Sequence, residues 1–248
     1  MAGPQITPTP SAHEIAANLN AVRARIAAAC TRSGRATEDV RLIAVSKTRP
    51  IEAVQTAIQA GQLDFGENQI QDALKKIPNI ETPGVQWHFI GPLQSNKTKH
   101  LPGNFQWWHT LDRTDIAKRV SRKAVELSAT INALIQVNVI HDPAKSGVLP
   151  EELPALLEQL MAEDLAGIKL RGLMTIGPHG GGETELRNCF GKLRGLLETS
   201  RSQLGLSDFD QLSMGMTNDM EQAIAEGATM VRVGSAIFGS RNLITPTK

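Results

Sequence analysis

Short apolar runs alternate with segments of helical periodicity along most of the chain. After a first amphipathic helix predicted at 11–32, eight such runs follow, and most end in polar or glycine residues. They lie at 42–46, 63–65, 86–90, 106–111, 133–140, 170–176, 210–214 and 229–233. Alternating strands and helices are typical of repeated βα units with a parallel sheet. The even spacing of eight units predicts an α/β fold, a single (β/α)8 barrel of the TIM type with an extra N-terminal helix. An open doubly wound sheet is the alternative.

Length and composition agree with one domain of this kind. The chain has 248 residues, 41% hydrophobic and 21% charged, which is ordinary for a globular protein. A net charge of +1 gives no reason to expect a nucleic acid or an anionic membrane as partner. We expect a disordered tail at 1–12, the barrel at 13–241 and a short C-terminal tail at 242–248.

No targeting or membrane signal is visible, so the expected location is the cytoplasm. The first residues lack the apolar core of a signal peptide, and no apolar stretch is long enough for a membrane span. Cys30 and Cys189 lie far apart in helix-like segments and read as buried apolar residues. The six histidines show no metal-binding spacing, so no metal site is expected.

The candidate chemistry lies at the carboxyl ends of the strands, where barrels of this kind place their sites. Lys47 follows the first apolar run directly, and Pro50 then opens a helix. Desolvation at a strand end lowers the pKa of an amine toward the nucleophilic range. Position alone nevertheless favours an ammonium group that extends past the strand end to solvent.

The segments after the seventh and eighth strands indicate a phosphate site. Ser213 begins the loop SMGMTND, and Arg232, Gly234 and Ser235 belong to VRVGSAIFG. In this fold, the loops after these two strands and a short extra helix commonly bind phosphate. Each segment alone is typical of a turn, but their joint position favours the phosphate site. A nucleophilic lysine facing a phosphate site suggests pyridoxal 5'-phosphate (PLP), which needs both.

Five groups of residues carry a resemblance to a known family. They are AVSKTRP at 44–50, DFGENQIQDALKK at 64–76, WHFIGPLQSNK at 87–97, RGLMTI at 171–176, and LSMGMTNDMEQAI with VRVGSAIFGSR at 212–241. These segments resemble the YggS/PROSC-type PLP-binding family, in the family order, from the first helix to Arg241. Ser235 stands where many members have threonine, and Asp142 stands where they more often have glutamate.

The resemblance implies a fold, a cofactor and a role. It implies a single-domain barrel similar to the N-terminal domain of alanine racemase, with PLP held as a Schiff base on Lys47. The implied function is vitamin B6 homeostasis without an established enzymatic reaction. PLP-requiring apoenzymes or regulatory proteins are the candidate partners, and we expect a monomer.

The remaining site residues each have a structural alternative. We expect Ser213, Gly234 and Ser235 to contact the phosphate. Arg232 is expected to point into the barrel mouth, toward the phosphate or the ring, with an ion pair inside the barrel as the alternative. Asn68, Met174 and Met214 are expected near the ring; a turn role for Asn68 and core packing for the methionines are the alternatives.

Two enzyme hypotheses compete with a carrier. An amino-acid racemase or decarboxylase of the alanine-racemase type needs acid–base groups on both faces of the cofactor. The chain has no tyrosine and little sequence after Arg241 for a second domain, and lone histidines such as His88 or His109 are more often structural. A Schiff-base aldolase fits the lysine and the phosphate site equally well by chemistry alone. The family motifs favour the PLP carrier, with no catalytic residues.

Overall fold

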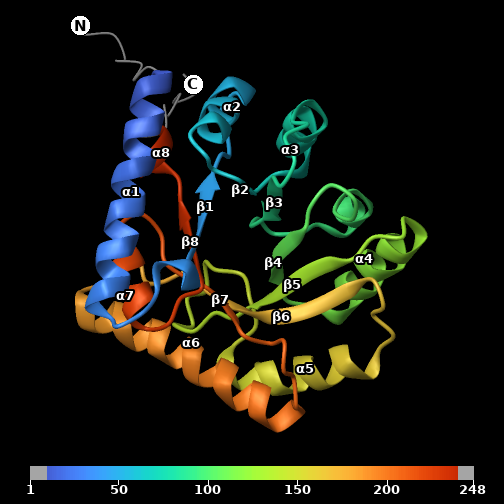
Figure 1. The fold of residues 1–248 in the computed structure, drawn as a ribbon. Helices are drawn as coiled ribbons and strands as arrows, with labels where there is room; N and C mark the ends of the chain where they lie inside the picture. Colours follow the sequence, from blue (N-terminus) through green and yellow to red (C-terminus); the bar gives the residue numbers. More distant parts are fainter. Residues whose placement is uncertain (1–9, 240–248) are drawn as a thin grey trace, which may run out of the picture.

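Eight parallel strands close a barrel in the computed structural model, which describes residues 10–239 (Figure 1). The strands are β1 (Arg41–Val45), β2 (Asp64–Glu67), β3 (Gln86–Phe89), β4 (Trp107–Leu111), β5 (Ile131–Gln136), β6 (Ile168–Met174), β7 (Gln211–Ser213) and β8 (Met230–Val233). Each strand pairs with the next in sequence, and β1 also pairs with β8. The predicted (β/α)8 barrel is therefore confirmed, and the open sheet is wrong.

Helices fill the connections between the strands. They are α1 (Ala12–Arg32), α2 (Ile51–Gln59), α3 (Ile70–Lys76), α4 (Thr114–Glu126), α5 (Leu153–Ala162), α6 (Glu183–Leu204), α7 (Met220–Ala225) and α8 (Ser235–Phe238). Four 3-10 helices add to them: η1 (Thr37–Asp39), η2 (Ile77–Asn79), η3 (Ser95–His100) and η4 (Pro150–Glu152). Only η3 occupies the connection from β3 to β4.

The helix α1 covers one flank of the barrel. It begins with a capping box in which Ser11 and Glu14 bond each other's backbone N–H groups, and it packs against α2, α7 and α8 (Figure 1). This confirms the extra N-terminal helix. The predicted tails at 1–12 and 242–248 lie almost entirely outside the described residues, and they stay predictions.

Side chains of the strands alternate between two apolar regions, as the pleat of a strand requires. The larger region lies between barrel and helices and contains Ala44, Phe65, Trp108, Val231 and Val233. The smaller one fills the barrel interior and consists of Ile43, Trp107, Leu134, Met174 and Met230, with Ile176 packed against it. This division decides which residues of each strand end can face the barrel mouth.

The fifth strand is shorter than its apolar run. The run extends to 140, but β5 ends at Gln136. The Asn138 side chain bonds the backbone of Asp142, and His141 adopts a φ of 56°, so the chain turns out of the sheet. A local side-chain turn therefore overrides the hydrophobic pattern here.

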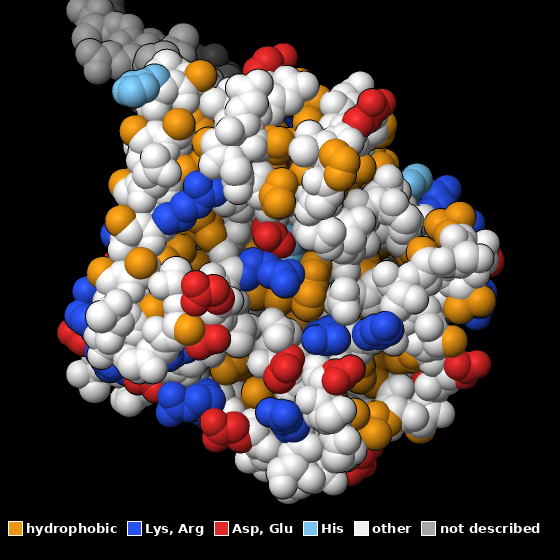
Figure 2. All heavy atoms as spheres, in the orientation of Figure 1, with side chains coloured by type: hydrophobic (Ala, Val, Ile, Leu, Met, Phe, Trp, Pro, Cys, Tyr) orange, Lys and Arg blue, Asp and Glu red, His pale blue; other side chains and the backbone are white. Residues whose placement is uncertain are grey.

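The surface and the thiols agree with the composition. On the face drawn in Figure 2, basic and acidic side chains are interspersed, and no large patch of one sign gathers. Cys30 and Cys189 are buried, as expected, and both are free thiols. None of the helices in the described part of the chain has the length and apolar character needed to cross a membrane.

Candidate functional site

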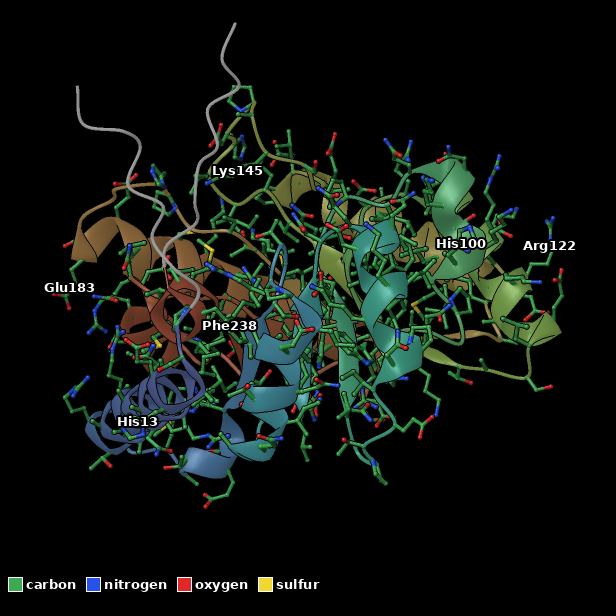
Figure 3. The ribbon with its side chains drawn as sticks, turned by 90° about the horizontal axis from the view of Figure 1, so that it is seen from above. His13, His100, Arg122, Lys145, Glu183 and Phe238 are labelled. Carbon is green, nitrogen blue, oxygen red and sulfur yellow. The ribbon has the colours of Figure 1, made fainter. Side chains whose placement is uncertain are left out.

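A cavity of about 630 Å³ lies at the carboxyl ends of the strands. Lys47, Arg232, Gly234 and Ser235 line it, together with the loops that follow β6 and β7. Seen from above (Figure 3), Lys145 comes from the loop after β5, and Phe238 lies in α8 beside α1. The structure thus brings together four of the eight predicted site residues.

Lys47 reaches the cavity because of the alternation along β1. Ile43 packs inside the barrel, and Val45 and Lys47 line the cavity above it. Lys47 is half-buried, and the next residue, Thr48, adopts a φ of 62°, which turns the chain sharply toward α2. The strand end therefore delivers the lysine side chain to the barrel mouth.

A buried ion pair fixes the backbone just before this lysine. Lys76 of α3 places its Nζ 2.7 Å from Glu67 Oε1 and donates a hydrogen bond of 2.8 Å to the Ser46 carbonyl. The Ser46 hydroxyl also donates to Glu67 Oε1, at 2.7 Å. Both charged side chains are buried. This pair was not predicted from the sequence, because a separation of nine residues matches neither helix nor strand periodicity.

Arg232 points into the mouth as predicted, because Val231 and Val233 face the outer core. Its guanidinium donates to Ser213 Oγ at 2.7 Å and to the Thr175 carbonyl at 2.9 Å. It forms no ion pair within residues 10–239, so the ion-pair alternative receives no support there. Burial lowers the pKa of Arg232 to about 10, which leaves it cationic at neutral pH.

The other predicted residues lie around the cavity rather than on its wall. Ser213 is fully buried beneath Arg232, and Met174 belongs to the interior cluster. Met214 faces the outer core. Asn68 packs with its backbone against Gly91, where an added Cβ would come within 2.1 Å of the Asn68 carbonyl oxygen. None of these four lines the cavity.

Further lining residues were not predicted. Lys145 donates to the Gly177 carbonyl at 2.8 Å and so connects the loops after β5 and β6. Thr217 lines the cavity, and its hydroxyl accepts from Ser235 Oγ at 3.3 Å. A lysine or threonine in a polar loop gives no sequence signal that separates a lining residue from an exposed one.

The donor set fits an anion with a carbonyl group rather than a metal. The cavity wall carries the buried cation Arg232, the half-buried side chains of Lys47, Arg49 and Lys145, and the hydroxyl groups of Thr217 and Ser235. The carboxylate of Asp219 accepts from the Met216 N–H and so stabilises its own loop. Within 10–239, no three His, Cys, Asp or Glu side chains are grouped to hold a metal ion.

Comparison with known proteins shows the family to which the chain belongs. Residues 17–242 match the family described as the alanine racemase N-terminal domain. The pyridoxal phosphate homeostasis protein of Haemophilus influenzae is 45% identical over 230 residues, covering 92% of this chain and 96% of that protein.

Two solved structures show the same fold. PipY of Synechococcus elongatus, solved with PLP bound, superposes with a TM-score of 0.81 at 36% identity, over 91% of this chain and all of that one. Alanine racemase of Clostridium difficile has a TM-score of 0.72 at 13% identity, over 95% of this chain and 59% of that enzyme, a likeness of fold alone. The chain therefore belongs to the alanine racemase N-terminal domain family and, within it, to the YggS/PROSC-type group of the pyridoxal phosphate homeostasis proteins.

Proposed function

We propose that the chain binds PLP in the cavity at the barrel mouth, holds it as a Schiff base on Lys47, and serves PLP homeostasis. The observation that carries this proposal is the meeting of the Lys47 amine, the buried Arg232 guanidinium and the hydroxyl groups of Thr217 and Ser235 in a single cavity. Relatives named for this role and a relative solved with PLP support it. PLP-requiring apoenzymes are the proposed recipients, and a cytoplasmic monomer remains our expectation.

Each part of the cavity matches one part of PLP. The cofactor supplies an aldehyde that condenses with a primary amine, and it carries a dianionic phosphate. Lys47 provides the amine, and we assign the phosphate to the side of the cavity formed by Gly234, Ser235 and Thr217. Arg232 provides a cation next to either the phosphate or the ring.

The remaining predicted residues act through their neighbours in this proposal. Ser213 orients Arg232 by accepting its hydrogen bond. Met174 fills the barrel interior, and Met214 and Asn68 support the segments that carry the lining residues. Direct contacts between these side chains and the cofactor stay predictions.

Borohydride reduction followed by peptide mapping tests the proposal. Reduction of the protein mixed with PLP should leave a pyridoxyl group on the peptide that contains Lys47. Lys145, the other lysine on the cavity wall, provides an internal comparison. An adduct on Lys145, or on any other lysine in place of Lys47, would overturn the assignment.

Much of the affinity should come from the phosphate. Charge-assisted hydrogen bonds contribute about 1.5–3 kcal/mol each, so pyridoxal without its phosphate should bind about 100-fold more weakly or worse. Ser235→Ala should weaken PLP binding about tenfold. Fluorescence or absorbance titration measures both, with Ser202→Ala on the exposed face of α6 as control. Equal affinities for pyridoxal and PLP would refute the phosphate site.

We expect no appreciable racemase, transaminase or decarboxylase turnover. His88 and His109, which the sequence offered as substitute bases, are fully buried and bond each other inside the barrel, away from the cavity wall. Racemisation needs acid–base groups on both faces of the cofactor. Exchange of the α-proton of amino acids, followed by NMR in heavy water, measures this. Exchange at an enzyme-like rate that disappears in Lys47→Ala would identify a catalyst instead of a carrier.

A further inference from the structure

A chain of hydrogen bonds runs through the barrel interior from the cavity to the opposite rim. Arg232 on β8 donates to Ser213 Oγ at 2.7 Å, and Ser213 Oγ lies 2.8 Å from His109 Nδ1 on β4. His109 Nε2 lies 2.9 Å from His88 Nδ1 on β3. His88 Nε2 lies 2.9 Å from Oδ1 of Asp64, the first residue of β2. We call these five residues the donor chain.

The two ends of the donor chain fix its direction. A guanidinium can only donate hydrogen bonds, and an ionised carboxylate can only accept them. Ser213 therefore accepts from Arg232, which leaves its hydroxyl proton to donate to His109 Nδ1. His109 then donates from Nε2 to His88 Nδ1, and His88 donates from Nε2 to Asp64. Each contact then has one donor and one acceptor, provided that both imidazoles are neutral and protonated on Nε2.

Burial supports the same protonation state. Both histidines are fully buried. Desolvation lowers the pKa of His88, against the opposing effect of Asp64. It lowers the pKa of His109 well below the ordinary value, and the neighbouring His88 and the cations Arg232 and Arg41 add to the effect. An added proton on His109 would place a second donor against Ser213, whose own hydroxyl proton would lose its acceptor.

Arg232 depends on this arrangement because it is a buried cation held by neutral acceptors. Its contacts are the Ser213 hydroxyl and the Thr175 carbonyl, and within 10–239 no carboxylate lies in ion-pair range. The carboxylate of Asp219, on the same cavity wall, favours the charged form of Arg232 without a direct bond to it. Along the hydrogen-bonded groups, the compensating carboxylate is that of Asp64, at the end of the donor chain. Bonded donors in series polarise one another in a low-dielectric interior.

We propose that His109 and His88 are positioning residues, which hold the Ser213 hydroxyl as an acceptor for Arg232 and so fix the guanidinium in the barrel mouth, with Asp64 anchoring the chain at the opposite rim. The alternative is that the histidines only satisfy each other as core residues. The predicted effect of the donor chain on PLP binding rests on the proposed function. The predicted tautomers of His88 and His109 do not depend on it.

The first experiment uses the protein without ligand. Long-range ¹H–¹⁵N NMR of histidine-labelled protein at neutral pH should show both His88 and His109 as neutral Nε2–H tautomers. An Nδ1–H tautomer or an imidazolium at either position would overturn the donor chain.

The second experiment measures PLP affinity in variants. His109→Leu breaks the chain and should weaken PLP binding about tenfold, whereas His109→Gln offers a donor and an acceptor and should restore most of the affinity. Denaturant unfolding of both variants separates this effect from lost stability. A core role alone predicts equal affinities for the Leu and Gln variants.

Variants at the rim keep the test independent of the buried core. Asp64→Ala removes the terminal acceptor from a partly exposed site and should weaken PLP binding about 2- to 10-fold. Asp210→Ala is the matched control. Asp210 precedes β7 at the same rim, and among the ion pairs of the described chain it pairs only with Arg171, across 3.9 Å.

The outcomes separate the positioning role from the proposed function. If wild-type protein forms no adduct on Lys47, the proposed function fails, and the NMR measurement of the histidine tautomers still tests the donor chain. If wild-type, His109→Leu and Asp64→Ala bind PLP equally, the positioning role is overturned and the proposed function stands.

Discussion

Lys47→Ala is expected to abolish the covalent retention of PLP and to leave the barrel folded. Lys47 and Lys145 are the lysines on the cavity wall within residues 10–239, and Lys47 extends from the end of β1 into the mouth. Its half-buried side chain lies above the apolar interior rather than in it, so its removal leaves no core cavity. Mass spectrometry after borohydride reduction should find no pyridoxyl group on the variant.

Lys145→Ala is the matched control for this result. It removes the other cavity lysine and its bond to the Gly177 carbonyl, but it should keep the adduct on Lys47. Equilibrium dialysis should still detect weakened, reversible PLP binding by Lys47→Ala, because the phosphate donors remain. An adduct of undiminished yield in Lys47→Ala would show that the cofactor is bound through another amine.

The fold and the placement of Lys47 and Arg232 at the barrel mouth could be predicted, because both depend on local patterns. Eight apolar runs gave the barrel, and the rule that sites lie at the carboxyl ends of its strands selected Lys47 and Arg232. Strand periodicity also placed Arg232 correctly, since residues on either side of it are apolar and face the helices.

The sequence of a short strand does not show which of its alternate residues face the barrel interior. Ser213 and Met214 are adjacent at the end of β7, so only one of them can face the barrel interior. Both were expected near the cofactor. In the structure, Ser213 faces inward and Met214 packs outward. The register of β7 with β6 and β8 determines which of its side chains face the interior.

Contacts made by barrel closure also left no sequence signal. His109 and Ser213 are separated by 104 residues and meet across the interior. Lone histidines in apolar runs look structural, and nothing in their spacing indicates that they bond each other. Interactions of this kind follow from the tertiary fold and can be found only in the structure.

The second large effect is expected at Lys76, where Lys76→Met should destabilise the protein by about 3–5 kcal/mol. The Lys76 side chain is paired with Glu67 Oε1 at 2.7 Å, and Glu67 is fully buried. Oε2 of Glu67 has no hydrogen-bond partner within the described residues. Removing the lysine therefore leaves a buried carboxylate with the Ser46 hydroxyl as its hydrogen-bond donor.

Urea unfolding of three variants measures this effect. Lys75→Met is the control, because the adjacent Lys75 is exposed and pairs only loosely with Asp72, so its loss should leave the midpoint nearly unchanged. Lys76→Met combined with Glu67→Gln removes both charges and should recover much of the stability. Because Lys76 also bonds the Ser46 carbonyl beside Lys47, the single variant should retain less PLP under native conditions as well. Equal unfolding midpoints for Lys75→Met and Lys76→Met would show that the buried pair does not hold this strand end.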